Sequence, residues 1–152
     1  MVRPLKFKRL LQLDYALFVP RRLAGSIREE NLKAAMEQLP LATSIGGQYR
    51  QQLTTAAGKA GWPLRIELSC SSFTQAAQAV KTGAFAAALP SLAAAAFAPG
   101  EVDQFPLPFL KAYSRPICVA WNPRLTEVRP TVLKAISVLE QVLADDQGIK
   151  RL

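Results

Sequence analysis

The sequence contains no histidine, and this absence removes several kinds of enzyme site. A Ser-His-Asp triad and a Cys-His pair both need an imidazole to carry the proton. A serine nucleophile can use lysine instead, but no Ser-x-x-Lys motif occurs. Gly58-Lys59 is not part of a phosphate-binding loop, because Leu53 stands where that motif needs its first glycine and Ala60 where it needs Ser or Thr. The sequence therefore favours a binding module over an enzyme, and it predicts no metal and no cofactor.

Cysteine is scarce as well, since the chain has only Cys70 and Cys118. Two distant cysteines make neither a disulfide framework nor a zinc signature. Both lie in apolar runs, so both are predicted to be small buried side chains.

Long apolar runs are also missing. The longest, residues 84–99, is interrupted by Pro90 and Ser91, and a membrane span takes about 20 apolar residues. Asp14 interrupts the apolar stretch near the N-terminus and no small-residue cleavage site follows it, so no secretion signal is indicated. These observations place the chain in the cytoplasm.

Acidic residues are outnumbered: 11 Asp and Glu stand against 19 Lys and Arg, which gives a formal net charge of +8. This balance permits a nucleic-acid or acidic partner but does not specify a fold. Most of the basic residues are scattered along the chain. Only Arg3, Lys6, Lys8 and Arg9 form a run without acids nearby. The run predicts a solvated terminal arm, with a nucleic-acid contact as the alternative.

The residues that are present indicate one packed domain, since 152 residues is an ordinary domain size and half of them are hydrophobic. Strand patterns alternate with helix patterns, and the connections are short. This order predicts an α/β fold with a largely parallel sheet flanked by helices. Strands are expected at residues 13–19, 41–44, 64–69, 85–89, 102–107 and 115–121, and helices at residues 26–38, 48–60, 72–82, 91–97 and 131–144.

Local signals support several of these helices. Ser26 and Glu29 have capping-box spacing, and Gly61 follows the helix at 48–60 as a left-handed terminator. The last helix carries one apolar stripe, formed by Leu133, Ile136, Leu139 and Val142.

Three strand-to-helix turns carry small residues at a helix start: residues 44–47, 70–72 and 89–91. In open α/β sheets, ligands bind beyond the carboxyl ends of the strands. The unpaired N–H groups and the dipole of a helix N-terminus favour a carboxylate or another anion there. We therefore predict a small-molecule pocket at these turns. In the alternative interpretation, the serines only cap their helices.

The stretch "SCSSFTQAAQAVKTGAFAAALP" resembles the second half of the effector-binding domain of LysR-type transcriptional regulators. Its order is a strand, small polar residues, a helix, a glycine, an apolar strand and Leu-Pro. "LDYALFVP" resembles the strand that leads from the first lobe into the second, and "VDQFPLPFLKAYSRPICVAWNP" resembles the return. The resemblance runs from about Leu5 to about Ala144.

This resemblance implies one truncated effector-binding domain over residues 1–152, like the second lobe of a type 2 periplasmic-binding-protein-like fold. Residues from about 20 to 110 would form the complete second lobe. Residues 5–19 and 113–144 would supply the crossing strands and the C-terminal helix of the first lobe. We expect residues 13–19 and 117–121 to lie side by side and antiparallel, with the last helix packed close by.

The family's winged helix-turn-helix, its linker helix and most of its first lobe are not found in these residues, so the resemblance assigns DNA binding to no residue here. It implies a small, acidic organic effector and no catalysis. Effector contacts would fall at Ser44, Ile45 and Gly46 on one turn and at Ser71, Ser72 and Phe73 on the other.

An incomplete lobe should expose sheet edge and apolar surface, so a homo-oligomer is expected, with Leu139 and Val142 involved. The runner-up is a free-standing ligand-binding or protein-interaction module that oligomerises through this half-lobe surface. An enzyme of unknown type is the third interpretation.

Overall fold

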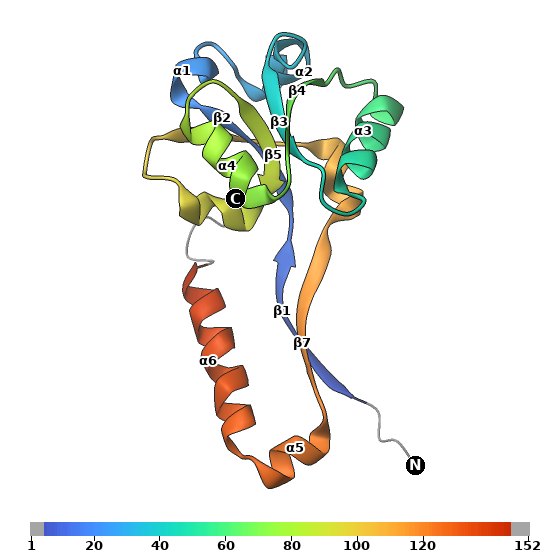
Figure 1. Cartoon of the computed structure of the whole chain (residues 1–152), viewed down its shortest axis with the longest axis vertical. Coiled ribbons are helices and arrows are strands. Elements are labelled where there is room, and N and C mark those ends of the chain that lie inside the picture. The colour runs from blue at the N-terminus through green and yellow to red at the C-terminus, as the bar shows by residue number, and fades with distance from the viewer. Residues whose placement is uncertain (1–4, 147–152) are drawn as a thin grey trace. The chain divides into compact units, whose positions relative to one another are not determined.

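The structure, a computed structural model, describes residues 5–146 of the chain (Figure 1). The chain divides into two compact units. Residues 14–114 form one, which we call the sheet unit. The segments 1–13 and 115–152 form the other, which we call the ribbon unit.

The sheet unit is built on a mixed five-stranded sheet. Its strands lie in the order β4 (Arg65–Cys70), β3 (Pro40–Ser44), β5 (Ala86–Pro90), β2 (Tyr15–Pro20) and β6 (Val102–Pro106). β3 pairs in parallel with β4 and β5, whereas β2 pairs antiparallel with β5 and β6. The mixed α/β fold is confirmed, but the predicted largely parallel sheet is not. The reason is β2, which is inserted in the opposite direction between two strands that come much later in the sequence.

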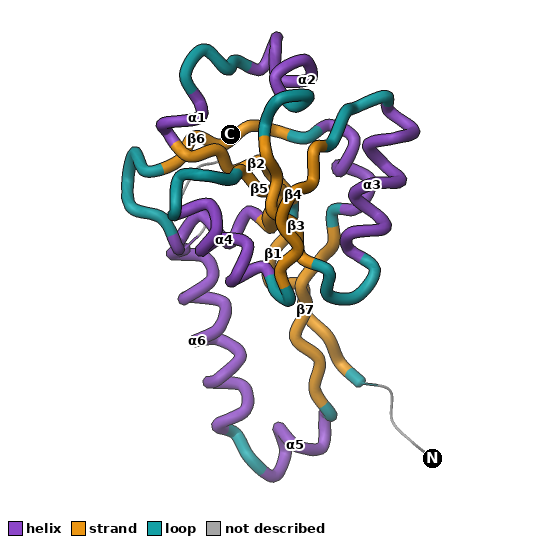
Figure 2. The backbone as a smooth tube through the Cα atoms, turned by 45° about the horizontal axis from the view of Figure 1, so that its top comes forward, coloured by secondary structure: helices purple, strands orange, loops and turns teal. Residues whose placement is uncertain are grey.

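Alternate residues of each strand face opposite sides of this sheet, and each side has its own apolar core. Leu17 and Ala88 lie in one core, and Phe18 and Leu89 lie in the other. The helices α3 (Tyr49–Ala60) and α4 (Phe73–Lys81) lie on opposite sides of the strands (Figure 2). The shorter helical segments are α1 (Arg21–Ala24), η1 (Glu29–Asn31), α2 (Leu32–Ala35), η2 (Ser91–Ala96) and η3 (Pro108–Tyr113).

The ends of the longer helices follow the sequence signals. α3 ends at Gly61, whose φ of 68° lies in the left-handed region that glycine adopts without steric cost. The helix predicted at 26–38 is shorter in the structure, where η1 and α2 cover residues 29–35. The amide of Arg28 donates to the Asn31 side chain at 2.7 Å, so the first turn begins at Glu29 and not after Ser26.

The ribbon unit consists of two antiparallel strands and two helices. β1 (Lys6–Leu13) pairs with β7 (Arg115–Trp121), and α5 (Pro123–Val128) and α6 (Thr131–Asp146) follow. Lys8 on β1 forms an ion pair with Glu140 on α6 at 2.6 Å. Leu11 and Ile136 are the buried apolar residues of this unit within the described residues. The sequence analysis did not predict α5.

Two expectations about the ribbon unit are wrong. Of residues 13–19, only Leu13 pairs with β7, opposite Arg115, because the chain leaves the ribbon at Asp14 and continues as β2 in the other sheet. The basic run is also no solvated arm, since Lys6, Lys8 and Arg9 lie within β1 (Arg3 lies outside the described residues). A two-stranded ribbon leaves long cationic side chains exposed, so their charge does not exclude a strand.

Cys118 is exposed, contrary to the prediction, whereas Cys70 is buried as predicted. The register explains the difference. Val119 lies opposite Lys8, whose side chain reaches α6, and Cys118 therefore points to the other face of the ribbon. Apolar neighbours in the sequence do not imply burial when only one face of a strand is covered.

The two thiols should consequently differ in reactivity. Burial raises the pKa of the Cys70 thiol, so both access and thiolate content are low there. We expect one thiol per chain to react rapidly with Ellman's reagent at low protein concentration, and the second only after unfolding. Cys118→Ser should remove the fast phase. A fast phase that survives in Cys118→Ser would contradict the placement of Cys118 on the open face.

Candidate functional site

Two of the predicted turns lie side by side at one end of the sheet. β3 and β4 are neighbouring parallel strands, and Ser44 pairs with Cys70 at their carboxyl ends. Just beyond this pair, the amide of Ile45 donates to the carbonyl of Cys70 at 2.8 Å. A methyl group on Gly46 would lie 3.4 Å from the Ser71 carbonyl oxygen, so the two turns touch. The structure therefore brings together all six of the predicted contact residues.

The third turn differs from these two. The amide of Ser91 donates to the carbonyl of Asp14 at 2.8 Å, so it is already used within the fold. η2 begins after Pro90 without a side-chain cap, although Ser91 was predicted to provide one. The backbone amide of Ser91 is therefore not available to a ligand at the candidate site.

The serine side chains of the two turns have local partners. The hydroxyl of Ser72 accepts from the Gln75 amide at 3.2 Å, as a helix cap does. Both the amide and the hydroxyl of Ser71 donate to the Gln75 side-chain oxygen, at 2.9 and 2.8 Å. Ser44 is buried, and its hydroxyl accepts from the Gly46 amide at 3.3 Å. The hydroxyl protons of Ser72 and Ser44 take no part in these bonds.

Two helices start next to these turns. The partial positive charge at a helix N-terminus favours an anion there. α3 follows the first turn and α4 follows the second, and neither has an acidic residue in its first turn. The amides of Phe73 and Thr74 have no acceptor within α4, as is general for the first turn of a helix. Arg50 on α3 donates to the Ser69 hydroxyl on β4 at 3.0 Å, which holds a cation near the end of β4.

Three aromatic rings form an apolar wall beside the turns. Phe73 meets Tyr49 edge to face, with ring centroids 4.7 Å apart, and Tyr15 stacks on Tyr49 at 5.3 Å. The hydroxyl of Tyr49 donates to the Ala88 carbonyl at 2.7 Å. Ile45 on the first turn is 50% exposed and adds apolar surface there. Sequence reasoning identified Phe73 and Ile45 but missed both tyrosines, although Tyr49 is the first residue of the helix that follows the first turn.

Thr43 is a buried polar residue next to this site. Its side chain is 1% exposed, and its hydroxyl has no hydrogen-bond partner within the described part of the chain. Buried hydroxyls usually have a partner. A water molecule or a ligand atom that entered beside β3 would satisfy this one.

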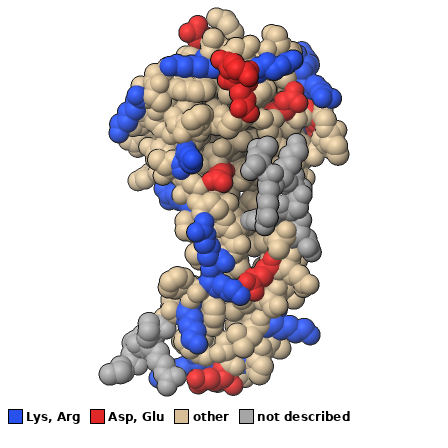
Figure 3. All heavy atoms as spheres, turned by 180° about the vertical axis from the view of Figure 1, so that it is seen from behind, with Lys and Arg blue, Asp and Glu red and all other residues tan. Residues whose placement is uncertain are grey.

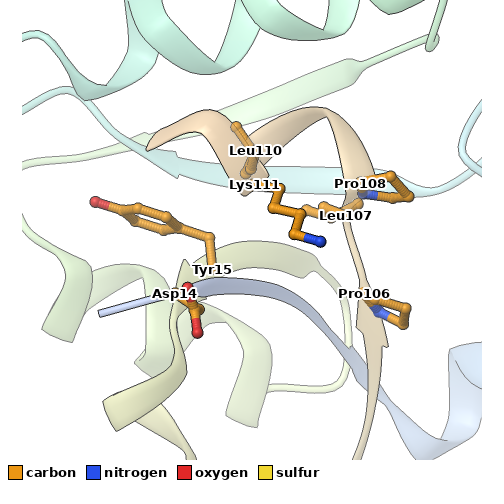
Figure 4. Close-up of a pocket in the computed structure, with 7 residues that line it drawn as sticks. All are labelled: Asp14, Tyr15, Pro106, Leu107, Pro108, Leu110 and Lys111. Atoms are coloured by element: carbon orange, nitrogen blue, oxygen red, sulfur yellow. The ribbon is translucent and has the colours of Figure 1, made fainter. Parts of the chain in front are cut away.

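A small cavity lies next to the aromatic wall (Figure 4). Its volume is about 210 Å³, and Tyr15 belongs to both features. Asp14 on its rim accepts a hydrogen bond from Ser114. The lining residues are Asp14, Tyr15, Pro106, Leu107, Pro108, Leu110 and Lys111. The cavity is below the usual range for ligand pockets, about 300 Å³ and above, so it alone would hold only a fragment of an effector.

Burial, with a smaller contribution from Tyr15, raises the pKa of Tyr49 far above its usual range. Tyr49 therefore stays neutral when folded, whereas in the unfolded chain it ionises near pH 10, about its ordinary pKa. A pKa raised by folding gives stability that is present below the unfolded pKa and lost as the pH rises above it.

Tyr49→Phe should show this dependence. At neutral pH the variant should lose about 1 kcal/mol of unfolding free energy with the hydrogen bond to Ala88. Above about pH 10 the difference from the natural protein should shrink by about 1.4 kcal/mol per pH unit. Urea unfolding at several pH values measures it. Tyr15→Phe, which keeps the stacked ring, is the control at neutral pH, and parallel stability curves for Tyr49→Phe and the natural protein would contradict the account.

A model of the family described as the LysR substrate binding domain matches residues 3–144. The chain therefore belongs to the LysR substrate-binding domain family, which confirms the resemblance drawn from the sequence. Comparison with curated proteins finds no match. Among the described residues, no helix has both the length and the apolar character needed to cross a membrane.

Solved structures show the same fold. A proposed transcriptional regulator from Vibrio parahaemolyticus aligns with a TM-score of 0.66 at 18% identity, covering 97% of this chain and 69% of that one. The CcmR regulatory domain from Synechocystis, in complex with 2-PG, aligns at 0.62 and 17% identity, with 94% and 71% covered. CbnR, a LysR family transcriptional regulator, aligns at 0.57 and 19% identity, with 80% and 43% covered. The chain spans less than half the length of the CbnR chains that it matches.

Proposed function

We propose that the chain is an effector-binding, regulatory part of a LysR-type transcriptional regulator, and that its ligand is a small acidic organic molecule. The contact between the turns at Ser44–Gly46 and Ser71–Phe73 carries this proposal, because two helix N-termini without acidic residues meet there. First-turn amides and serine hydroxyls would bind a carboxylate. Phe73 and Ile45 would contact the carbon skeleton. That a similar fold holds 2-PG supports a small ligand.

In this proposal the sheet unit corresponds to the second lobe, expected at about residues 20–110. The ribbon unit would contribute crossing strands and the C-terminal helix of the first lobe. The family assignment favours this role over a free-standing module. A regulatory role of this kind involves no catalysis and belongs in the cytoplasm.

DNA would be read by the helix-turn-helix that the family carries, and not by these residues. The charge distribution agrees with this. On the face seen in Figure 3, Lys and Arg are interspersed with Asp and Glu and do not form one continuous patch. Such a surface supports at most weak, salt-sensitive contact with phosphates.

Self-association is the second part of the proposal. Of the apolar stripe predicted on α6, only Ile136 is buried, while Leu139 and Val142 are 46% and 54% exposed. Leu125 and Val128 on α5 are exposed as well. Exposed apolar groups at this density mark an interaction surface, and a second copy of the chain is the partner that is always present.

The effector site is tested by calorimetry on the chain joined to the first lobe of a LysR-type domain, because half a site leaves one side of the ligand in water. We expect saturable binding of at least one member of a panel of aliphatic and aromatic mono- and dicarboxylates. Ser71→Ala/Ser72→Ala should weaken that binding by about 1–3 kcal/mol for each hydrogen bond lost to the ligand. The double variant loses a helix cap as well, so its folding is checked by circular dichroism.

Ser91→Ala is the matched control, since Ser91 also begins a helical segment after a strand but lies outside the two turns. It should bind the ligand as the natural protein does. Unchanged affinity in the folded double variant would show that the serines only cap α4, and the pocket would then be assigned wrongly.

A further inference from the structure

Arg50 is a cation in the first turn of α3 that no carboxylate of the fold neutralises. Its guanidinium donates to the Ser69 hydroxyl at 3.0 Å, and it forms no ion pair within residues 5–146. Glu67, two residues before Ser69, pairs with Arg65 instead. The positive end of a helix dipole disfavours a cation in the first turn. The charge of Arg50 therefore does not stabilise the helix that carries it, and residues that break a local rule of this kind are expected at functional sites.

The start of α3 is also less well satisfied than the start of α4. The hydroxyl of Ser72 caps α4, whereas Gln48, the N-cap residue of α3, makes no side-chain cap hydrogen bond. The amides of the first turn of a helix have no acceptor within that helix. The first turn of α3 therefore combines such donors with the cation of Arg50, and both attract an anion.

The first turn of α3 lies over Thr43 of β3. On one side, Arg50 reaches Ser69 of β4, which pairs with Thr43. On the other side, Tyr49 reaches the Ala88 carbonyl of β5, the second neighbour of β3. The buried residue two positions before Thr43 lies in the same core as Tyr49, and residues two apart in a strand face the same side. The side chain of Thr43 therefore points to the start of α3.

The hydroxyl of Thr43 is an independent sign of a ligand at this place. The residue is 1% exposed, and its hydroxyl has no hydrogen-bond partner in the described part of the chain. A buried hydroxyl without a partner destabilises a fold, and valine has nearly the same shape without a polar atom. The hydroxyl gains a partner when an oxygen of a ligand, or a water molecule bound to it, enters beneath the first turn of α3.

We propose that the effector carries two acidic groups and that Arg50, with Thr43 beneath it, binds the second. This rests on the proposed function, in which the amides of Phe73 and Thr74 at the start of α4 bind the first. Ser69, which holds the guanidinium of Arg50, precedes the second turn by two residues, roughly 7 Å along an extended chain, and this span is about the length of a dicarboxylate of four or five carbons. A monoacid would leave the cation of Arg50 without a counter-charge.

Succinate and its monomethyl ester are matched probes, because the ester keeps the carbon skeleton and loses one charge. The full chain, isotope-labelled, is titrated with each at constant ionic strength, and the amide signals of Phe73 and Thr74 give the two dissociation constants. We expect succinate to bind about tenfold more tightly than the ester, since hydrogen bonds between charged groups are the stronger ones. The side-chain Nε–H signal of Arg50 should shift with succinate alone, and Arg50→Gln should abolish the difference between the probes.

Lys59→Gln is the matched control, because it removes the same charge from the last turn of the same helix. It should keep the preference for succinate within a factor of about two, since exposed charges that far apart are screened by salt. Thr43→Val should weaken succinate binding by about threefold or more and leave the ester unaffected, without lowering the urea midpoint of unfolding, because the hydroxyl loses no partner in the fold. A lower midpoint would overturn the assignment of Thr43 to the ligand.

Equal affinity for the two probes in the natural protein would overturn this inference and leave the two turns as a site for monoacids. A preference for succinate that Lys59→Gln reduces as much as Arg50→Gln does would also overturn it, because the net charge of the chain would then explain the preference. If neither probe shifts Phe73 and Thr74 saturably, the proposed function fails together with the inference.

Discussion

Strands β3 and β4 pair in parallel, with Ser44 opposite Cys70, and the amide of Ile45 donates to the Cys70 carbonyl just past the last pair. Because the strands run the same way, their carboxyl ends stop at the same edge of the sheet. The turn after β3 and the turn after β4 therefore lie next to each other, and they lead into α3 and α4. The candidate site depends on this pairing, since neither turn alone presents both helix N-termini or both sides of a ligand.

Packing beneath the site maintains this arrangement. β5 continues the sheet beside β3, and its alanines at 86–88 are completely or almost completely buried. Larger side chains there would push apart the two cores that cover the sheet. In the middle of β5 the Ala88 carbonyl accepts from Tyr49, which fixes the ring that Phe73 and Tyr15 contact. The hydrogen bond from Tyr49 therefore ties the aromatic wall to the alanine-rich strand.

The parallel half of the fold could be predicted from the sequence because its signals are local. The order strand, turn, helix at residues 41–60 and again at 65–81 follows from apolar periodicity, from Ser72 as a cap and from Gly61 as a terminator. The place of β2 could not be predicted, since its apolar run fits any buried position. Asp14 does interrupt the apolar stretch, but that signal does not tell which sheet the residues on either side of it join. The exposure of Cys118 was missed for a related reason. Sequence patterns report that a strand is apolar, but not how many of its faces the rest of the chain covers.

The six predicted contact residues could be found because they lie on two strand-to-helix turns, which the sequence pattern shows. Tyr15 and Tyr49 join them through tertiary packing, which no local pattern shows. The most direct test of the site is an amide chemical-shift titration of the isotope-labelled chain with millimolar concentrations of small carboxylates. The account predicts saturable shifts confined to residues 44–47 and 71–74, with the largest at Phe73 and Thr74, whose amides have no acceptor within α4. Shifts that gather instead around residues 106–111 at the small cavity, or that never saturate at the turns, would contradict it.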